Sequence, residues 1–84
     1  MSADSEIAAF NLGLAIEAHR ATAQIARRLR QLGAGALFPL ATSAADAADQ
    51  TLAFACQCLA KARELGCDAQ ILVEADRLIA ESIR

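Results

Sequence analysis

The chain has 84 residues, and 56% of them belong to the apolar set of Ala, Val, Ile, Leu, Met, Phe, Trp, Tyr and Cys. With glycine left out, this share already exceeds the roughly 45–50% that soluble domains reach with glycine counted, which excludes a disordered chain. The net charge of −2 provides no overall attraction to nucleic acid or to an anionic membrane. Because so small a domain has much surface for its volume, the apolar surplus predicts association with another chain.

The composition also predicts the fold class. Alanine, the best helix former, occurs 22 times, whereas β-branched and aromatic residues are scarce. We therefore expect an all-α protein with one helical domain over residues 1–84. The acidic start of the chain lacks the basic segment of a signal peptide, and its longest uncharged run, 31–45, is broken by Gly33, Gly35 and Pro39. We expect a cytoplasmic protein with no membrane partner.

The first helix is predicted over residues 5–32, with Asp4 or Ser5 as its cap and Gly33 and Gly35 after its end. Apolar residues recur every three or four positions and form one continuous stripe. The stripe consists of Ile7, Phe10, Leu14, Ala18, Ala21, Ile25, Leu29 and Leu32.

A second, shorter stripe occupies the opposite side of this helix: Leu12, Ile16 and Ala23. One neighbouring helix cannot cover both sides. We therefore expect these three residues to contact a second subunit, and Gly13 to allow a close backbone approach beside them.

The segment 33–38 reads as a turn that ends in Leu37 and Phe38. These two side chains either cap the end of the bundle or project as a docking contact. A second helix is predicted over 39–65, since Pro39 suits a first helical position, with Ser43 as an alternative cap. Its apolar side consists of Leu40, Ala41, Ala44, Ala48, Leu52, Ala55, Leu59 and Ala62.

A third helix is predicted over 68–84, after Gly66 closes the second helix and Asp68 caps the third. Arg77 and Glu81 have the spacing of an i,i+4 ion pair. The apolar face consists of Ile71, Leu72, Ala75, Leu78, Ile79 and Ile83. The predicted architecture is a long antiparallel αα-hairpin plus a shorter third helix, assembled as a symmetric dimeric helical bundle.

The cysteines and the single histidine do not form a recognisable ligand set. Cys56 and Cys58 are two residues apart, so on a helix their side chains diverge and cannot bind one metal ion. With Cys67 they make an odd number, which favours free thiols. His19 is either a pH-sensitive interface residue or a hydrogen-bonded, structural one. We expect no metal, no cofactor and no enzymatic activity.

Four arginines gather in the second half of the first helix, where residues 18–32 contain no acid: Arg20, Arg27, Arg28 and Arg30. They could form a patch for an anion, a nucleic acid or an acidic partner. Alternatively, cations favour the end of a helix, and Asp46 and Asp49 of the second helix could neutralise them.

The run Ala62-Arg63-Glu64-Leu65-Gly66-Cys67, followed by Leu72 and Ala75, resembles a helix-turn-helix motif and implies a DNA-reading helix. That helix would offer the acidic side chains Asp68, Glu74 and Asp76 to a polyanion, with only Arg77 basic.

These features favour a small helical-bundle protein that acts through protein–protein interaction, as an adaptor, regulator or accessory subunit that also forms a homodimer. The alternative is a nucleic-acid-binding regulator that uses the four arginines. The acidic third helix and the absence of interleaved aromatic residues disfavour nucleic acid.

Overall fold

The computed structural model describes residues 2–32 and 38–83 and contains three α-helices. They are α1 (Ala3–Gln31), α2 (Phe38–Glu64) and α3 (Ala69–Ile83). The prediction of an all-α protein is confirmed, and the predicted boundaries differ from these by one or two residues. None of the described helices has both the length and the apolar character required to cross a bilayer.

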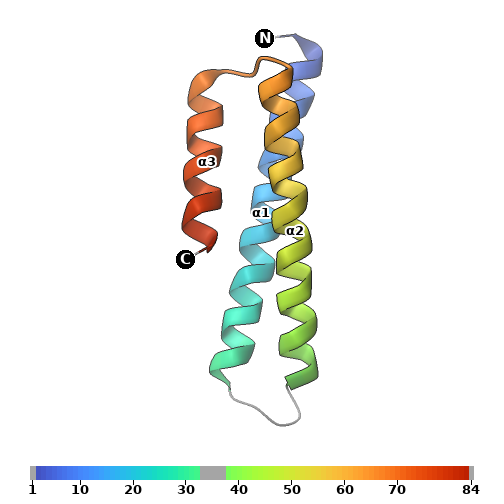
Figure 1. The fold of residues 1–84 in the computed structure, drawn as a ribbon, viewed down its shortest axis with the longest axis vertical. Helices are drawn as coiled ribbons and strands as arrows, with labels where there is room; N and C mark the ends of the chain where they lie inside the picture. The colour runs from blue at the N-terminus through green and yellow to red at the C-terminus, as the bar shows by residue number, and fades with distance from the viewer. Residues whose placement is uncertain (1, 33–37, 84) are drawn as a thin grey trace.

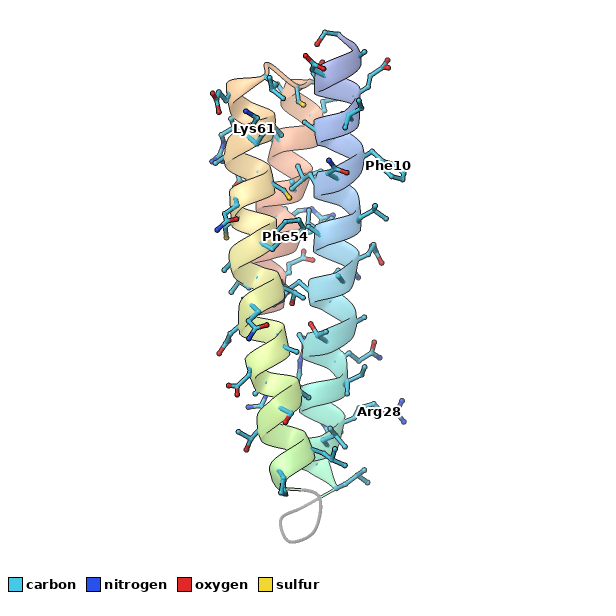
Figure 2. All side chains as sticks on the ribbon, turned by 90° about the vertical axis from the view of Figure 1, so that its right-hand side faces the viewer. Phe10, Arg28, Phe54 and Lys61 are labelled. Atoms are coloured by element: carbon cyan, nitrogen blue, oxygen red, sulfur yellow. The ribbon has the colours of Figure 1, made fainter. Side chains whose placement is uncertain are left out.

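The three helices form an elongated molecule of 50 × 18 × 13 Å. Figure 1 shows α1 and α2 side by side and antiparallel along its whole length, whereas α3 runs back from one end and stops part of the way along. The short α3 therefore covers one side of the α1–α2 pair over part of its length. The opposite side of the pair has no helix over it (Figure 2).

The start of α1 is stabilised by a serine pair rather than by the predicted caps Asp4 or Ser5. The Ser2 hydroxyl accepts the Ser5 backbone N–H at 3.2 Å, and the Ser5 hydroxyl donates to the Ser2 carbonyl at 2.9 Å. Ser5 is thus one turn inside the helix and buried. Ser2, two positions before Asp4 and three before Ser5, provides the capping hydrogen bond, so the helix starts earlier than predicted.

The end of α2 is closed by Gly66, which adopts a positive φ of 73°. The Cys67 N–H donates to the Ala62 carbonyl and the Gly66 N–H donates to the Arg63 carbonyl, each at 3.1 Å. This pair of bonds defines a Schellman motif, whose left-handed position favours glycine. The Schellman motif therefore explains why Gly66 follows Ala62 by four positions, the spacing on which the helix-turn-helix resemblance is based.

The prediction that Asp68 caps α3 is confirmed, because its carboxylate accepts the Gln70 N–H at 2.8 Å. The helix-turn-helix resemblance is not matched by the arrangement of the helices. That motif sets its two helices at a wide angle, whereas α3 turns back alongside α2 (Figure 1). The Schellman motif and the aspartate cap together make a tight antiparallel turn.

The core between the helices is made mostly of small side chains. It contains the buried residues Ala8, Leu12, Ala15, Ile16, Ala55, Leu59, Ala62, Cys67, Ala75 and Ile79. Alanines on both α1 and α2 allow the two helices to approach closely, because little side-chain volume separates the backbones.

The predicted assignment of the two faces of α1 is wrong. Leu12, Ile16 and Ala23 were expected at a subunit interface, but they are only 1%, 5% and 8% exposed within the single chain. The stripe of larger residues faces outward instead. The alanine-lined side of α1 permits the closer contact with α2, so packing distance selects it over the bulkier stripe.

Helix α3 docks through its predicted apolar face and through surface ion pairs. Ala75 and Ile79 are buried, and Ile71, Leu72 and Leu78 pack against the core. The predicted Arg77–Glu81 pair is present at 2.7 Å. Arg77 also bonds to Glu74, which lowers the pKa of that carboxyl. Between helices, Arg63 of α2 pairs with Asp76 of α3 at 2.6 Å.

Candidate functional site

Large apolar side chains are exposed along one side of the α1–α2 pair. We name this set the open apolar face, and each member is more than half exposed. It consists of Ile7, Phe10, Leu14, Ile25 and Leu32 on α1 and of Leu40 and Phe54 on α2.

The open apolar face lies opposite α3. On α1, the side next to α3 is marked by Ala9, Leu12 and Ile16, which line a groove with residues of α3. At 100° per residue, Leu14 and Ile25 lie about 150° or more around the helix from the middle of that side.

The same geometry holds on α2. Arg63 reaches α3 through its ion pair, and Phe54, nine positions earlier, points about 180° away. Figure 2 views the pair from the side without α3: Phe54 lies in front of α2, and Phe10 extends from the outer edge of α1. The two helices therefore contribute to one continuous surface.

The middle of the stripe on α1 carries no charge, and Ala18 and Ala21 are its small exposed members. Arg28 lies at the outer edge of the face, in line with Phe10 (Figure 2). The predicted contact residue Leu37 lies outside the described residues, and the side chain of Phe38 is not among those described. The role predicted for these two residues stays a prediction.

The four arginines do not share one face of α1. Arg27 and Arg30 line a cavity on the side of α3, and Arg20 lies beside Arg27 in an adjoining hollow. Arg28 extends from the outer edge of the helix (Figure 2). Arg20 also pairs with Glu17 at 3.6 Å. The sequence cluster is thus divided between two sides of the helix.

The expected neutralisation by the acids of α2 is not observed. Among the described residues, neither Asp46 nor Asp49 forms an ion pair with Arg27, Arg28 or Arg30. The guanidinium groups of Arg27 and Arg30 therefore lack a carboxylate partner within the described chain.

His19 is buried between α1 and α2 and is only 4% exposed. Its Nδ1 lies 3.0 Å from the carbonyl oxygen of Ala48. A carbonyl can only accept, so Nδ1 carries a proton, and Nε2 of the neutral ring is an acceptor. The hydroxyls of Thr22 and Thr51, 2.9 Å apart, complete a polar cluster across the two helices. Among described atoms, Nε2 has no hydrogen-bond partner.

A cavity of about 400 Å³ lies where α3 ends above the α1–α2 pair. His19, Arg27 and Arg30 of α1 form part of its wall, together with Asp49 of α2 and Ser82 of α3. The remaining wall residues are mostly alanines. The chain thus places an unpartnered buried acceptor and two unpaired cations around one cavity.

The three cysteines have different environments. Cys56 is exposed, Cys58 is partly buried and Cys67 is buried, and all three are free thiols. Burial raises the pKa of the Cys58 thiol. Within the described part of the chain, no three His, Cys, Asp or Glu side chains gather as metal ligands.

Sequence reasoning missed two features of this site. The outward orientation of the large stripe has a signal in the alanines of α1, whose spacing marks the close-packed side. The cavity has no such signal, because it depends on where α3 stops relative to the other two helices. Comparisons with protein families, curated proteins and solved structures found no match to this chain.

Proposed function

We propose that this chain is a small cytoplasmic helical-bundle protein that acts through protein–protein interaction and pairs with a second copy through the open apolar face. The observation that carries the proposal is that face itself, a surface of Leu, Ile and Phe side chains, each more than half exposed. Burying such a side chain fully stabilises an assembly by about 1.5–3 kcal/mol relative to leaving it exposed.

The dimensions of the open apolar face suit a dimer interface. From Ile7 to Leu32 the stripe runs for about 37 Å at 1.5 Å per residue. Because α1 and α2 together are about 20 Å wide, the footprint of this side of the pair is on the order of 700 Å². A standard-size interface buries about 800 Å² per partner. A monomer rarely exposes so large an apolar patch.

The spacing of the stripe suits a straight partner. Its eight residues recur at intervals of three, four and four, an 11-residue repeat that includes Ala18, Ala21 and Leu29. This repeat corresponds to about 3.67 residues per turn, close to the natural helix, so the stripe runs almost parallel to the axis of α1. It can therefore contact another helix over its full length.

A second copy is the occupant that the surface favours. The α1 part of the face has no charge along its middle and is self-complementary, as a two-fold interface requires. On α2, Lys61 lies two turns from Phe54 and pairs with Glu64.

The outer flank of α1 carries Glu6, Glu17 and Arg28, also eleven residues apart. When two copies of α1 pack antiparallel with Glu6 of one beside Arg28 of the other, Glu17 meets its own copy at the two-fold axis. The ion pair of Glu17 with Arg20, at 3.6 Å, offsets that like charge.

Light scattering after size exclusion tests this proposal at micromolar concentration. We expect the wild-type chain at twice its 8.8 kDa mass, and the Leu14→Asp and Phe54→Asp variants as single chains. Val73→Asp is the matched control, because Val73 is 68% exposed on α3, away from the open apolar face. Circular dichroism verifies that each variant stays helical.

Two results would contradict the proposal. One is a wild-type chain that stays monomeric throughout the concentration series. The other is dissociation by Val73→Asp but not by Phe54→Asp. We do not propose nucleic-acid binding, because the four arginines are divided between two sides of α1 and Arg20 pairs with Glu17.

A further inference from the structure

The cavity at the end of α3 has the features of a ligand site that is separate from the open apolar face. It lies on the α3 side of the α1–α2 pair, and its wall includes His19, Arg27 and Arg30. His19 is buried, with only 4% of the residue exposed, yet its Nε2 has no partner among the described atoms. Leaving a buried polar atom unpaired costs about 1–3 kcal/mol, so a ligand that supplies a partner is favoured.

The donors and acceptors around the cavity define the ligand. Arg27 and Arg30 have no carboxylate partner in the described chain and offer several N–H groups to oxygen atoms. Nε2 of His19 requires the opposite, a donor, because Nδ1 already donates to Ala48. The ligand must therefore combine an anionic oxygen with an O–H group.

We infer that the cavity binds a small oxyanion that also carries a hydroxyl group, such as a hydrogen phosphate or a hydroxycarboxylate. Its anionic oxygens accept from Arg27 and Arg30, and its hydroxyl donates to Nε2 of His19. Nε2 is fully covered by its neighbours, so binding requires the side chains over it to move.

Asp49 also lines the cavity, and its negative charge disfavours every anion there to a similar degree. The preference among anions comes instead from Nε2 of His19, which requires a hydroxyl donor. Sulfate has no such donor near neutral pH, whereas phosphate of the same shape still carries a proton. The cavity therefore distinguishes phosphate from sulfate.

Nuclear magnetic resonance of the imidazole nitrogens provides a direct test, because His19 is the single histidine of the chain. Phosphate, sulfate, lactate and acetate are titrated into the full-length chain at constant ionic strength. We expect phosphate to shift the Nε2 resonance until the site is saturated. We expect its affinity to be about tenfold higher than that of sulfate, because one charge-assisted hydrogen bond changes an affinity by about this factor. Lactate is compared with acetate in the same way, since only lactate carries a hydroxyl.

The two arms distinguish the sources of the oxyanion. Saturation by phosphate alone assigns a phosphate site, and saturation by lactate alone assigns a hydroxycarboxylate site. Equal binding of sulfate and phosphate, together with equal binding of lactate and acetate, overturns the inference. The same holds if none of the four anions shifts the ring signals.

Variants distinguish phosphate binding in the cavity from nonspecific attraction of phosphate to positive charge on the protein. Arg27→Gln and Arg30→Gln should each weaken phosphate binding about tenfold. Lys61→Gln removes the same charge from an exposed position on α2, away from the cavity, and should leave binding unchanged. Asp49→Asn should strengthen the binding of phosphate and sulfate to a similar degree, because it removes a negative charge from the cavity wall. A Lys61→Gln effect as large as that of Arg27→Gln would contradict a specific site.

Discussion

His19 shows how one buried side chain combines a satisfied and an unsatisfied atom. Its Nδ1 bonds to the Ala48 carbonyl, which also accepts from the Thr51 hydroxyl at 3.0 Å. The carbonyl therefore keeps a partner if the ring is lost. Because Nε2 is unpaired, the polarity of the ring contributes little to folding.

We predict that His19→Leu changes the free energy of unfolding by less than about 1 kcal/mol, because leucine fills similar volume and removes the unpaired nitrogen. His19→Ala should cost about 2–3 kcal/mol through the cavity it leaves. Urea unfolding followed by circular dichroism measures both. Equal losses in the two variants would show that the Nδ1 hydrogen bond, rather than side-chain volume, stabilises this position.

The thiols provide a second prediction for individual residues. Cys56 is exposed, burial raises the pKa of Cys58, and Cys67 is buried with its S–H donating to the Ser5 carbonyl at 3.1 Å. Alkylation at mildly alkaline pH should therefore modify Cys56 first, Cys58 more slowly and Cys67 only on unfolding. Peptide mass spectrometry over a time course gives this order, and early modification of Cys67 would contradict its burial.

Among the helices, α3 is attached mainly by apolar contacts. Ile79 is buried in the core, whereas Asp76 pairs with Arg63 at the surface with both side chains about half exposed. Exposed ion pairs contribute about 0–1 kcal/mol, whereas removing a buried isoleucine side chain costs about 2–5 kcal/mol.

We therefore predict that Ile79→Ala lowers the unfolding free energy by about 2–4 kcal/mol and that Asp76→Asn lowers it by less than about 1 kcal/mol. Chemical denaturation monitored by circular dichroism compares the two. A larger loss for Asp76→Asn would mean that the ion pair, rather than the apolar face, positions α3.

The helices could be predicted from the sequence more fully than their faces. The turn between α2 and α3 could be predicted from Gly66 and Asp68. Gly66 adopts the positive φ of the turn, and the Asp68 carboxylate accepts a backbone N–H of α3. The inward side of α1 could not be chosen by apolar size, because Ile7 and Leu14 are larger than the buried Ala15. Close packing favours the smaller residue, and the partner helix needed to recognise this is distant in the sequence.

For the whole molecule, the two broad sides of the α1–α2 pair differ in structure. One is partly covered by α3 and contains the cavity, whereas the other carries the open apolar face (Figures 1 and 2). This division explains how a chain of 84 residues can be 56% apolar. Alanines fill the core, and the larger residues of the open apolar face remain available for a second copy.

If two copies pair through that face, thermal stability should depend on protein concentration. We predict that the midpoint of thermal unfolding rises with concentration for the wild-type chain, because mass action favours the folded dimer. Phe54→Asp should give a lower midpoint that does not change with dilution. Scanning calorimetry over a dilution series measures this, and a concentration-independent wild-type midpoint would contradict a dimer.

The hydrogen bond from Cys67 to Ser5 joins residues 62 positions apart at the end of the bundle where α2 turns into α3. Contacts of such long sequence separation form late in folding, because they close a long loop. We expect α1 and α2 to pair first and α3 to dock afterwards onto Leu12 and Ile16. Until then the first turns of α1 stay uncovered on that side, so this end of the protein is the last to be protected from amide hydrogen exchange.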